Sequence, residues 1–289
     1  MKTILLATDF SASAKDAARY GFDLACRIKA KVIIINAMII TAEVPQPGFA
    51  AWPGGEFDSL LQDYVNELQD FKTELESGLA PDAYHPPVQC INEAGRLTDV
   101  ISKAVAENNA DLVVIGTHMG GLMSSLLVGN HAGQLIDATT GPLLIVKPGT
   151  VFKPVKKIAF ATDFNNPEKD LAIIYSLIPF AKLLNAEILL AHVTDQQEEE
   201  EQDRLQKTLA EYLVELSNRA DYPHIYYRLI HNARTEAGLV WLCEHGQVDM
   251  LAMAHHSRNI FAEYFGHSHT KNMNKLSALP LLVFPLTVD

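Results

Sequence analysis

Short apolar runs alternate along the whole chain with longer segments in which apolar residues recur every three or four positions. Apolar runs of four to eight residues bounded by glycine, proline or polar residues are typical of buried strands. They predict strands at residues 3–8, 31–37, 88–92, 112–116, 143–146, 157–162, 187–193, 225–230, 250–254 and 281–284. The helical spacing predicts helices at residues 12–29, 57–79, 97–108, 131–138, 167–184, 198–219, 235–245 and 270–276.

This alternation of strands and helices determines the fold class. Strand, crossover helix and parallel strand form a right-handed unit, and its repetition gives a parallel sheet with helices on both faces. Ligands of such open sheets bind outside the carboxyl ends of the strands. We therefore expect an α/β protein whose functional residues follow directly after strands.

The apolar runs form two matching series. KTILLATDF at residues 2–10 corresponds to KIAFATDF at 157–164, and AKVIIINA at 30–37 corresponds to AEILLAHV at 186–193. Blocks DLVVIG and GPLLIVKP of the first half have the counterparts DMLAMA and LPLLVFP, in the same order, in the second half. The chain is therefore interpreted as a tandem duplication of a unit of roughly 145 residues.

The join between the units lies in a short segment with glycine and proline, which are typical of linkers. We place the first unit at residues 1–148, the linker at 149–154 and the second unit at 155–289. Only the first unit contains a long irregular segment, at residues 41–56, with three prolines and three glycines. A loop of this length inside a compact unit is usually functional, so it is a candidate lid or partner surface, or else a plain connector.

Composition narrows the classes of function. The chain has 289 residues and a net charge of −12, which argues against non-specific binding to nucleic acid or to an anionic membrane. No apolar stretch reaches the roughly 18 residues of a membrane span, and the amino terminus does not resemble a signal peptide. The three cysteines are far apart and fit buried reduced thiols. We expect a cytoplasmic protein.

The strongest candidate site lies in the stretch DLVVIGTHMGGLMSSLLVGN, at residues 111–130. Its apolar run ends at Gly116, and Gly120, Gly121 and Gly129 follow. Glycines after a buried strand let the backbone turn and approach a ligand, and the amino end of a following helix offers free N–H groups to an anion. The stretch predicts a phosphate-binding loop, although it matches neither the P-loop nor the G-x-G-x-x-G pattern.

This loop resembles the signature of the universal stress protein family, G-x2-G-x9-G-[ST]. Gly116 and Gly129 match, the second glycine falls on Met119 next to Gly120, and the final Ser/Thr falls on Asn130. The resemblance implies a Rossmann-like (adenine nucleotide alpha hydrolase-like) fold of two tandem units, each a five-stranded parallel sheet with helices on both faces. It also implies that the loop cradles the phosphates of ATP, with Mg accompanying the nucleotide.

Further candidate residues follow the first two strands. Thr8 and Asp9 end the first strand, and an acidic residue there can accept a hydrogen bond from a ribose hydroxyl or cap the next helix. The resemblance implies that Asp9 contacts the adenosine and that the backbone of Ala37 contacts adenine. His118 is of a residue type common at its position in the family, or is only a loop residue. Ser11 and Ser13 suit the N-cap of the first helix.

The second unit departs further from the signature. Its counterparts of the three glycines are Ala254, Ser257 and His267, and its Ser/Thr position is Ser268. We expect this unit not to bind ATP in the manner of the family. Its histidines suit a divalent metal chemically, but they lack standard ligand spacing, so no metal site is assigned.

Several functions remain open at this stage. The first hypothesis is a regulatory stress-response protein that binds an adenine nucleotide through the first unit. Its rival is a nucleotide-free scaffold that binds a protein or a small apolar ligand, and a metal-dependent hydrolase ranks below both. No enzyme motif is present, so no catalytic residue is assigned and slow ATP hydrolysis is the most that we expect. The resemblance implies an intramolecular pseudo-dimer through the strands 143–146 and 281–284, and the acidic surface leaves room for a homodimer.

Overall fold

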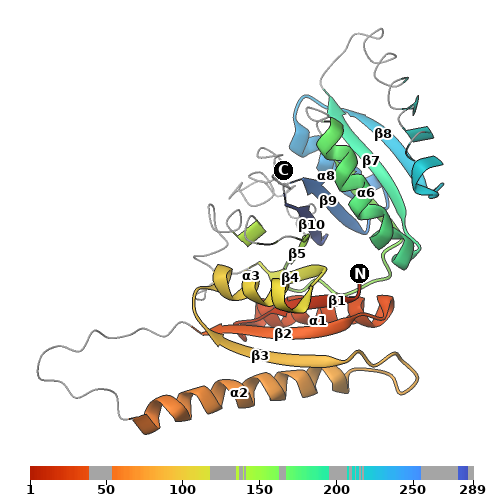
Figure 1. Ribbon diagram of the computed structural model, residues 1–289. Coiled ribbons are helices and arrows are strands. Elements are labelled where there is room, and N and C mark those ends of the chain that lie inside the picture. The colour runs from red at the N-terminus through yellow and green to blue at the C-terminus, as the bar shows by residue number, and fades with distance from the viewer. Residues whose placement is uncertain are drawn as a thin grey trace, which may run out of the picture.

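The computed structural model contains a sheet of ten strands that runs through the whole protein (Figure 1). It describes residues 1–38, 54–117, 135–136, 139, 141–162, 167–194, 218–254 and 279–285, and single positions between 207 and 216. The strand order is β3-β2-β1-β4-β5-β10-β9-β6-β7-β8. Each half of this order is one repeat of the duplicated sequence, and the halves meet at β5 and β10.

Strands and helices alternate in both units. The first unit contains β1 (Thr3–Ala7), α1 (Ala12–Ile28), β2 (Lys31–Met38), α2 (Gly54–Ser77), β3 (Val88–Ala94), α3 (Leu97–Asn108), β4 (Leu112–Gly116) and β5 (Leu143–Val146). The second contains β6 (Lys157–Ala161), α6 (Pro167–Leu184), β7 (Glu187–Thr194), β8 (Ile225–His231), α8 (Thr235–His245), β9 (Met250–Ala254) and β10 (Leu281–Phe284).

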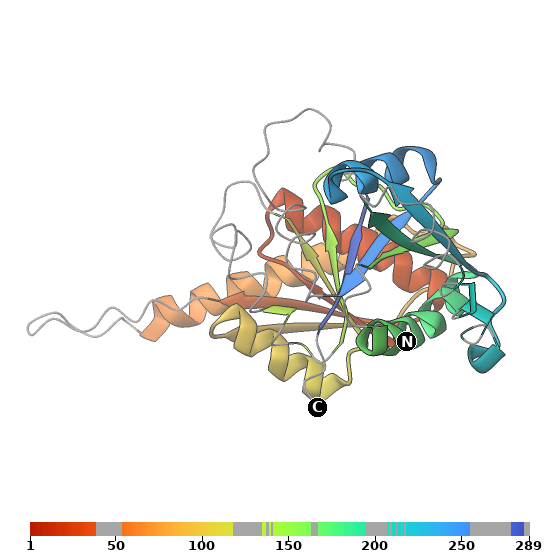
Figure 2. The same ribbon diagram turned by 90° about the horizontal axis from the view of Figure 1, so that it is seen from above.

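Helices cover both faces of the sheet, as the alternating elements require. One continuous apolar core joins the sheet to α1, α2 and α6, and a second core on the opposite face joins it to α3 and α8. The central strands are buried along their whole length because each of their faces meets a core. In Figure 2, which views the protein from above, helices lie on both sides of the strands.

Strands β5 and β10 form the junction between the units. They pair antiparallel, with Leu281 opposite Ile145 and Val283 opposite Leu143, whereas the other pairs of neighbouring strands are parallel. This is the contact that the family resemblance implied for strands 143–146 and 281–284. The two units therefore pack as an intramolecular pseudo-dimer around one continuous sheet.

The sequence predicted all ten strands, and each observed boundary lies within two residues of the predicted one. Five predicted helices correspond to α1, α2, α3, α6 and α8. The described positions between 207 and 220 are helical, in agreement with the helix predicted at 198–219. Most of the helix predicted at 131–138 and all of that at 270–276 lie outside the described residues. Residues 41–53 of the irregular segment predicted at 41–56 also lie outside them, whereas residues 54–56 belong to α2, which begins three residues earlier than predicted.

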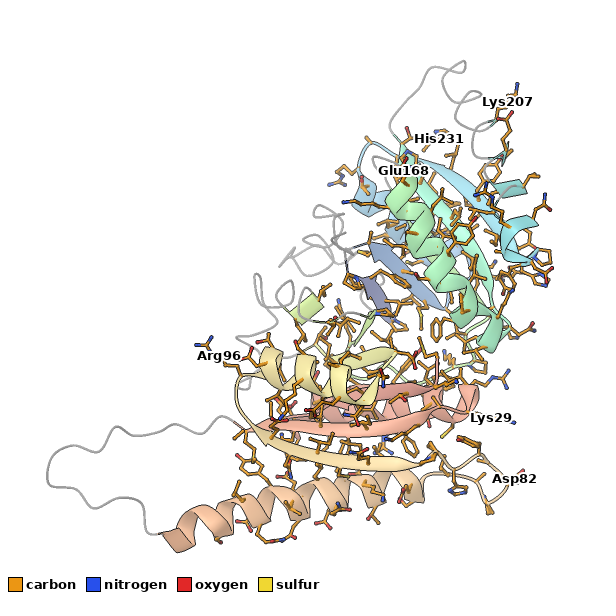
Figure 3. All side chains as sticks on the ribbon, viewed as in Figure 1. Lys29, Asp82, Arg96, Glu168, Lys207 and His231 are labelled. Atoms are coloured by element: carbon orange, nitrogen blue, oxygen red, sulfur yellow. The ribbon has the colours of Figure 1, made fainter. Side chains whose placement is uncertain are left out.

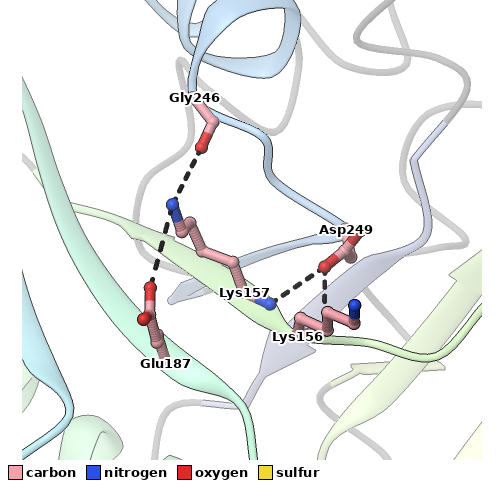
Figure 4. Close-up of polar contacts among 5 residues, drawn as sticks. All are labelled: Lys156, Lys157, Glu187, Gly246 and Asp249. Atoms are coloured by element: carbon pink, nitrogen blue, oxygen red, sulfur yellow. Dashed lines mark hydrogen bonds and ion pairs between the residues drawn. The ribbon is translucent and has the colours of Figure 1, made fainter.

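An aspartate stabilises the amino edge of the sheet in each unit. Asp249 lies before β9, and its Oδ2 accepts hydrogen bonds from the backbone N–H groups of Lys156 and Lys157, at 2.8 and 2.9 Å (Figure 4). Asp111 lies before β4 and does the same for Lys2 and Thr3, at 2.6 and 2.9 Å. In both units, one carboxylate thus joins the start of the fourth strand to the start of the first.

We expect Asp249→Ala to lower the free energy of unfolding by about 1–2 kcal/mol, because two backbone N–H groups lose a charged acceptor at a partly exposed site. Asp249→Asn retains one acceptor oxygen of similar shape and should fall between the wild type and the alanine variant. Urea denaturation followed by circular dichroism measures the difference. Identical midpoints for the wild type and Asp249→Ala would contradict this role.

Candidate functional site at the carboxyl edge of the first unit

The strand order of the first unit reverses at β1. From β1 the chain continues to β2 and β3 on one side, whereas β4 and β5 lie on the other side. The connections after β1 and β4 therefore lead to opposite sides of the sheet, and open α/β sheets bind ligands at this point of their carboxyl edge. Arg96 marks the carboxyl edge of the first unit in Figure 3, and Lys29 and Asp82 mark the opposite edge.

Asp9 lies in a tight turn between β1 and α1. Its Oδ1 accepts a hydrogen bond from the backbone N–H of Ser11 at 3.0 Å, and Phe10 has a left-handed φ of 63°. The Oγ1 of Thr8 accepts from the backbone N–H of Phe10 at 3.0 Å. Oδ2 of Asp9 has no partner among the described residues. The turn therefore holds the carboxylate beside the amino end of α1 with one oxygen uncommitted.

Ser11 is the N-cap of α1, as the sequence predicted. Its Oγ accepts a hydrogen bond from the backbone N–H of Ala14 at 3.2 Å. The cap therefore belongs to Ser11, and Asp9 accepts from the residue before the helix. Ser13, the other predicted cap, lies inside the helix, where its hydroxyl donates to the carbonyl of Thr117.

Gly116 lies where α1 meets the end of β4. A Cβ at this position would lie 2.6 Å from the carbonyl oxygen and 2.8 Å from the carbonyl carbon of Ser13. Because both are backbone atoms, no side-chain rotation can make room for it. Glycine is therefore required for packing at this position, whereas the sequence suggested only a role in turning the chain towards a ligand.

The second strand ends at the same edge of the sheet. Ala37 lies at the end of β2, partly buried against the core on the side of α3. The preceding residue, Asn36, is buried and donates a hydrogen bond from Nδ2 to the carbonyl of Thr8 at 2.8 Å. Sequence reasoning missed Asn36. One signal could have revealed it, since a polar residue, Asn36 or His192, interrupts the apolar run at the same position in both repeats.

Four of the predicted site residues therefore lie at the ends of three adjacent strands, and these are Thr8, Asp9, Ala37 and Gly116. The other four, His118, Gly120, Gly129 and Asn130, lie outside the described residues, as does Met119.

A lysine adds a cationic group next to this edge. Lys147 directly follows Val146, whose carbonyl accepts a hydrogen bond from the backbone N–H of Thr117 at 2.9 Å. Burial lowers the pKa of Lys147 to about 8, because the charged ammonium loses part of its hydration. At pH 7 this lysine still carries its proton, so the edge holds both a carboxylate and an ammonium group.

The second unit holds its corresponding edge differently. The hydroxyl of Thr162, the counterpart of Thr8, bonds to the buried carboxylate of Asp170 at 2.5 Å. Ala254 occupies the position of Gly116 and is buried. Asp163 and the four histidines of the last loop, His255, His256, His267 and His269, lie outside the described residues.

Within the described residues, no group of three or more histidine, cysteine, aspartate or glutamate side chains could hold a metal ion. In the same part of the chain, no helix is both long and apolar enough to cross a membrane.

The cysteines are free thiols and only partly exposed. Burial raises the pKa of Cys26 to about 11 and that of Cys243 to about 12, and it also raises the pKa of Cys90. Because the thiolate is the reactive form, we expect iodoacetamide at pH 7.5 to alkylate Cys26 and Cys243 on the order of 100-fold more slowly than a free thiol, and Cys90 also more slowly than a free thiol. Mass spectrometry over time measures the rates. A cysteine that reacts as fast as glutathione would contradict this assignment.

Comparisons with known proteins agree with the duplicated organisation. The profile of the "Universal stress protein family" matches residues 1–147 and again residues 154–285. A universal stress protein of Thermus aquaticus is 26% identical over 146 residues, which are 50% of this chain and 98% of that protein.

Solved structures resemble the fold of the whole chain. A universal stress protein from Archaeoglobus fulgidus superimposes with a TM-score of 0.67 at 14% identity, covering 98% of each chain. A putative universal stress protein from Pseudomonas aeruginosa superimposes with a TM-score of 0.52 at 12% identity, covering 99% of this chain and 93% of that chain. At these identities, the likeness concerns the fold alone.

Proposed function

This chain belongs to the universal stress protein family, and we propose that it is a regulatory protein that binds an adenine nucleotide through its first unit. The observation that carries the proposal is the position of Asp9 and Gly116. They flank the point at which the strand order reverses, where open α/β sheets bind nucleotides. The uncommitted Oδ2 of Asp9 suits a ribose hydroxyl, which is a hydrogen-bond donor.

The glycine-rich loop after Gly116 would hold the phosphates. His118, Gly120, Gly129 and Asn130 are its proposed contacts, and Ala37 would contact adenine through its backbone. Mg would accompany ATP by neutralising phosphate charge. Lys147 adds positive charge at the same edge of the sheet.

The second unit would then be a structural partner. Ala254 replaces the first glycine of the signature there, and the remaining signature positions hold no glycine. We propose unit boundaries at residues 1–148 and 155–289. We also propose that the protein is cytoplasmic, and that it acts by binding the nucleotide more than by hydrolysing it. We propose that the acidic chain can also bind a protein partner or a second copy of itself.

Thermal denaturation with and without ATP and Mg tests the proposal, because a ligand that binds only the folded state raises the melting temperature. We expect a concentration-dependent rise for the wild type and none for Gly129→Trp, in which an indole would fill the glycine loop. No rise for the wild type at millimolar ATP would overturn the proposal. An equal rise for both proteins would exclude the loop as the site.

A further inference from the structure

In both units, a side chain of the second strand donates a hydrogen bond to the carbonyl of the threonine that directly follows the first strand. In the first unit, Asn36 Nδ2 donates to the Thr8 carbonyl at 2.8 Å. In the second, His192 Nδ1 contacts the Thr162 carbonyl at 2.9 Å. A carbonyl oxygen only accepts, so Nδ1 of His192 is the nitrogen that carries hydrogen.

The bond from Asn36 to Thr8 replaces a backbone hydrogen bond at the end of the pairing between β1 and β2. The register between β1 and β2 ends at Ala7 opposite Ile35, and the backbone N–H of Thr8 still donates to the Ile35 carbonyl at 2.9 Å. The Thr8 carbonyl lies beyond this ladder, and the Asn36 side chain supplies its donor. Both backbone groups of Thr8 are thus held by β2, directly before the chain turns into Asp9.

The contact recurs although the residues differ. Asparagine and histidine share a side-chain N–H and little else, and each places it on the equivalent carbonyl. The neighbour of Asn36 on β3 is Asn92, whereas the neighbour of His192 on β8 is Leu229. The fold therefore accepts an apolar residue at the position of Asn92. The position that is polar in both units is that of Asn36 and His192, which donate to the threonine carbonyl.

Asn36 lowers the stability of the fold in one respect, because one end of its buried carboxamide is unpaired. The residue is only 4% exposed, and its Oδ1 has no hydrogen-bond partner among the described residues. A buried carboxamide with one unpaired end is less stable than an apolar side chain of the same shape. The hydrogen bond from Nδ2 to the Thr8 carbonyl therefore accounts for an asparagine at this position.

We propose that Asn36 is a positioning residue that fixes the Thr8–Asp9 turn, and thereby the carboxylate of Asp9, for the ligand of the first unit. The proposal rests on the proposed nucleotide site, but its structural part stands independently. The hydrogen bonds from Phe10 N–H to Thr8 and from Ser11 N–H to Asp9 report the order of the turn directly.

Two measurements on the full chain test this role: amide hydrogen exchange at Phe10 and Ser11, and titration with ATP and Mg. In Asn36→Leu, which removes the donor, we expect exchange at both amides to quicken at least tenfold relative to the amides of β1 and β2, and ATP affinity to fall at least tenfold. Asn36→His restores the donor used by the second unit and should stay within threefold of the wild type in both measurements. Asn92→Leu, the matched control, should do the same because it leaves the Asn36–Thr8 contact in place.

Faster exchange spread equally over β1 and β2 in Asn36→Leu would indicate a merely structural role and overturn the proposal. Unchanged exchange at Phe10 and Ser11, or Asn36→His behaving like Asn36→Leu, would overturn it as well. If the wild type fails to bind ATP, the proposed function fails, and the exchange measurements still decide whether Asn36 fixes the turn.

Discussion

Gly116→Ala is expected to lower the free energy of unfolding by about 2–3 kcal/mol, because the added methyl group meets the backbone of α1. Its Cβ would lie 2.6 Å from the Ser13 carbonyl oxygen, and relief requires α1 to move away from β4. The same movement would displace the turn that carries Asp9. Urea denaturation of the variant measures the loss of stability, with Mg-ATP titration as a second readout.

Gly78→Ala is the matched control for this change. A Cβ at Gly78, just after α2, would meet no atom closer than the Leu75 carbonyl at 3.7 Å, which is an ordinary contact. The control should change the free energy of unfolding by no more than about 0.5 kcal/mol. Equal losses in the two variants would show that the packing of α1 against β4 does not account for Gly116.

Asp9→Asn is expected to weaken the binding of Mg-ATP by at least tenfold while leaving stability nearly unchanged. The asparagine Oδ1 can still accept from Ser11 N–H, so the turn persists. The charge that would hold a ribose hydroxyl is lost, and a hydrogen bond to a charged group is worth about 1.5–3 kcal/mol. Titration calorimetry measures the affinity, and thermal denaturation without ligand measures the stability.

Asp163→Asn provides the corresponding change in the second unit. Its sequence position is equivalent to that of Asp9, but we propose no nucleotide site there, so the affinity should equal that of the wild type. If Asp163→Asn lost binding and Asp9→Asn did not, the nucleotide would bind to the second unit, and our assignment of the site to the first unit would be wrong.

The sequence was sufficient to predict the layers of this protein. The inner strands are compact apolar runs because both of their faces are buried, whereas the edge strands β3 and β8 mix apolar and polar residues. Each unit confirms the other because the apolar runs recur in the same order. Even the pairing of β5 with β10 followed from the family resemblance, since the duplicated chain repeats within itself a two-fold contact.

Contacts that join distant segments were not predictable in the same way. The bond between the Ser13 hydroxyl and Thr117, and that between Asp249 and the start of β6, connect residues far apart in the sequence. Neither follows from the hydrophobic periodicity, because each depends on one polar side chain. The aspartate that begins both DLVVIG and DMLAMA is the one sequence signal for the second bond. Asn36 was overlooked for the same reason, although its polarity within an apolar strand could have drawn attention to it.

The stoichiometry of nucleotide binding tests the central claim most directly. We would titrate nucleotide-stripped wild-type protein with ATP and Mg in a calorimeter and determine the number of sites per chain. We predict one saturable site, because only the first unit combines Asp9 with a glycine-rich loop. Two equivalent sites would contradict the assignment of the second unit as a structural partner, and no binding at millimolar ATP would contradict the account as a whole.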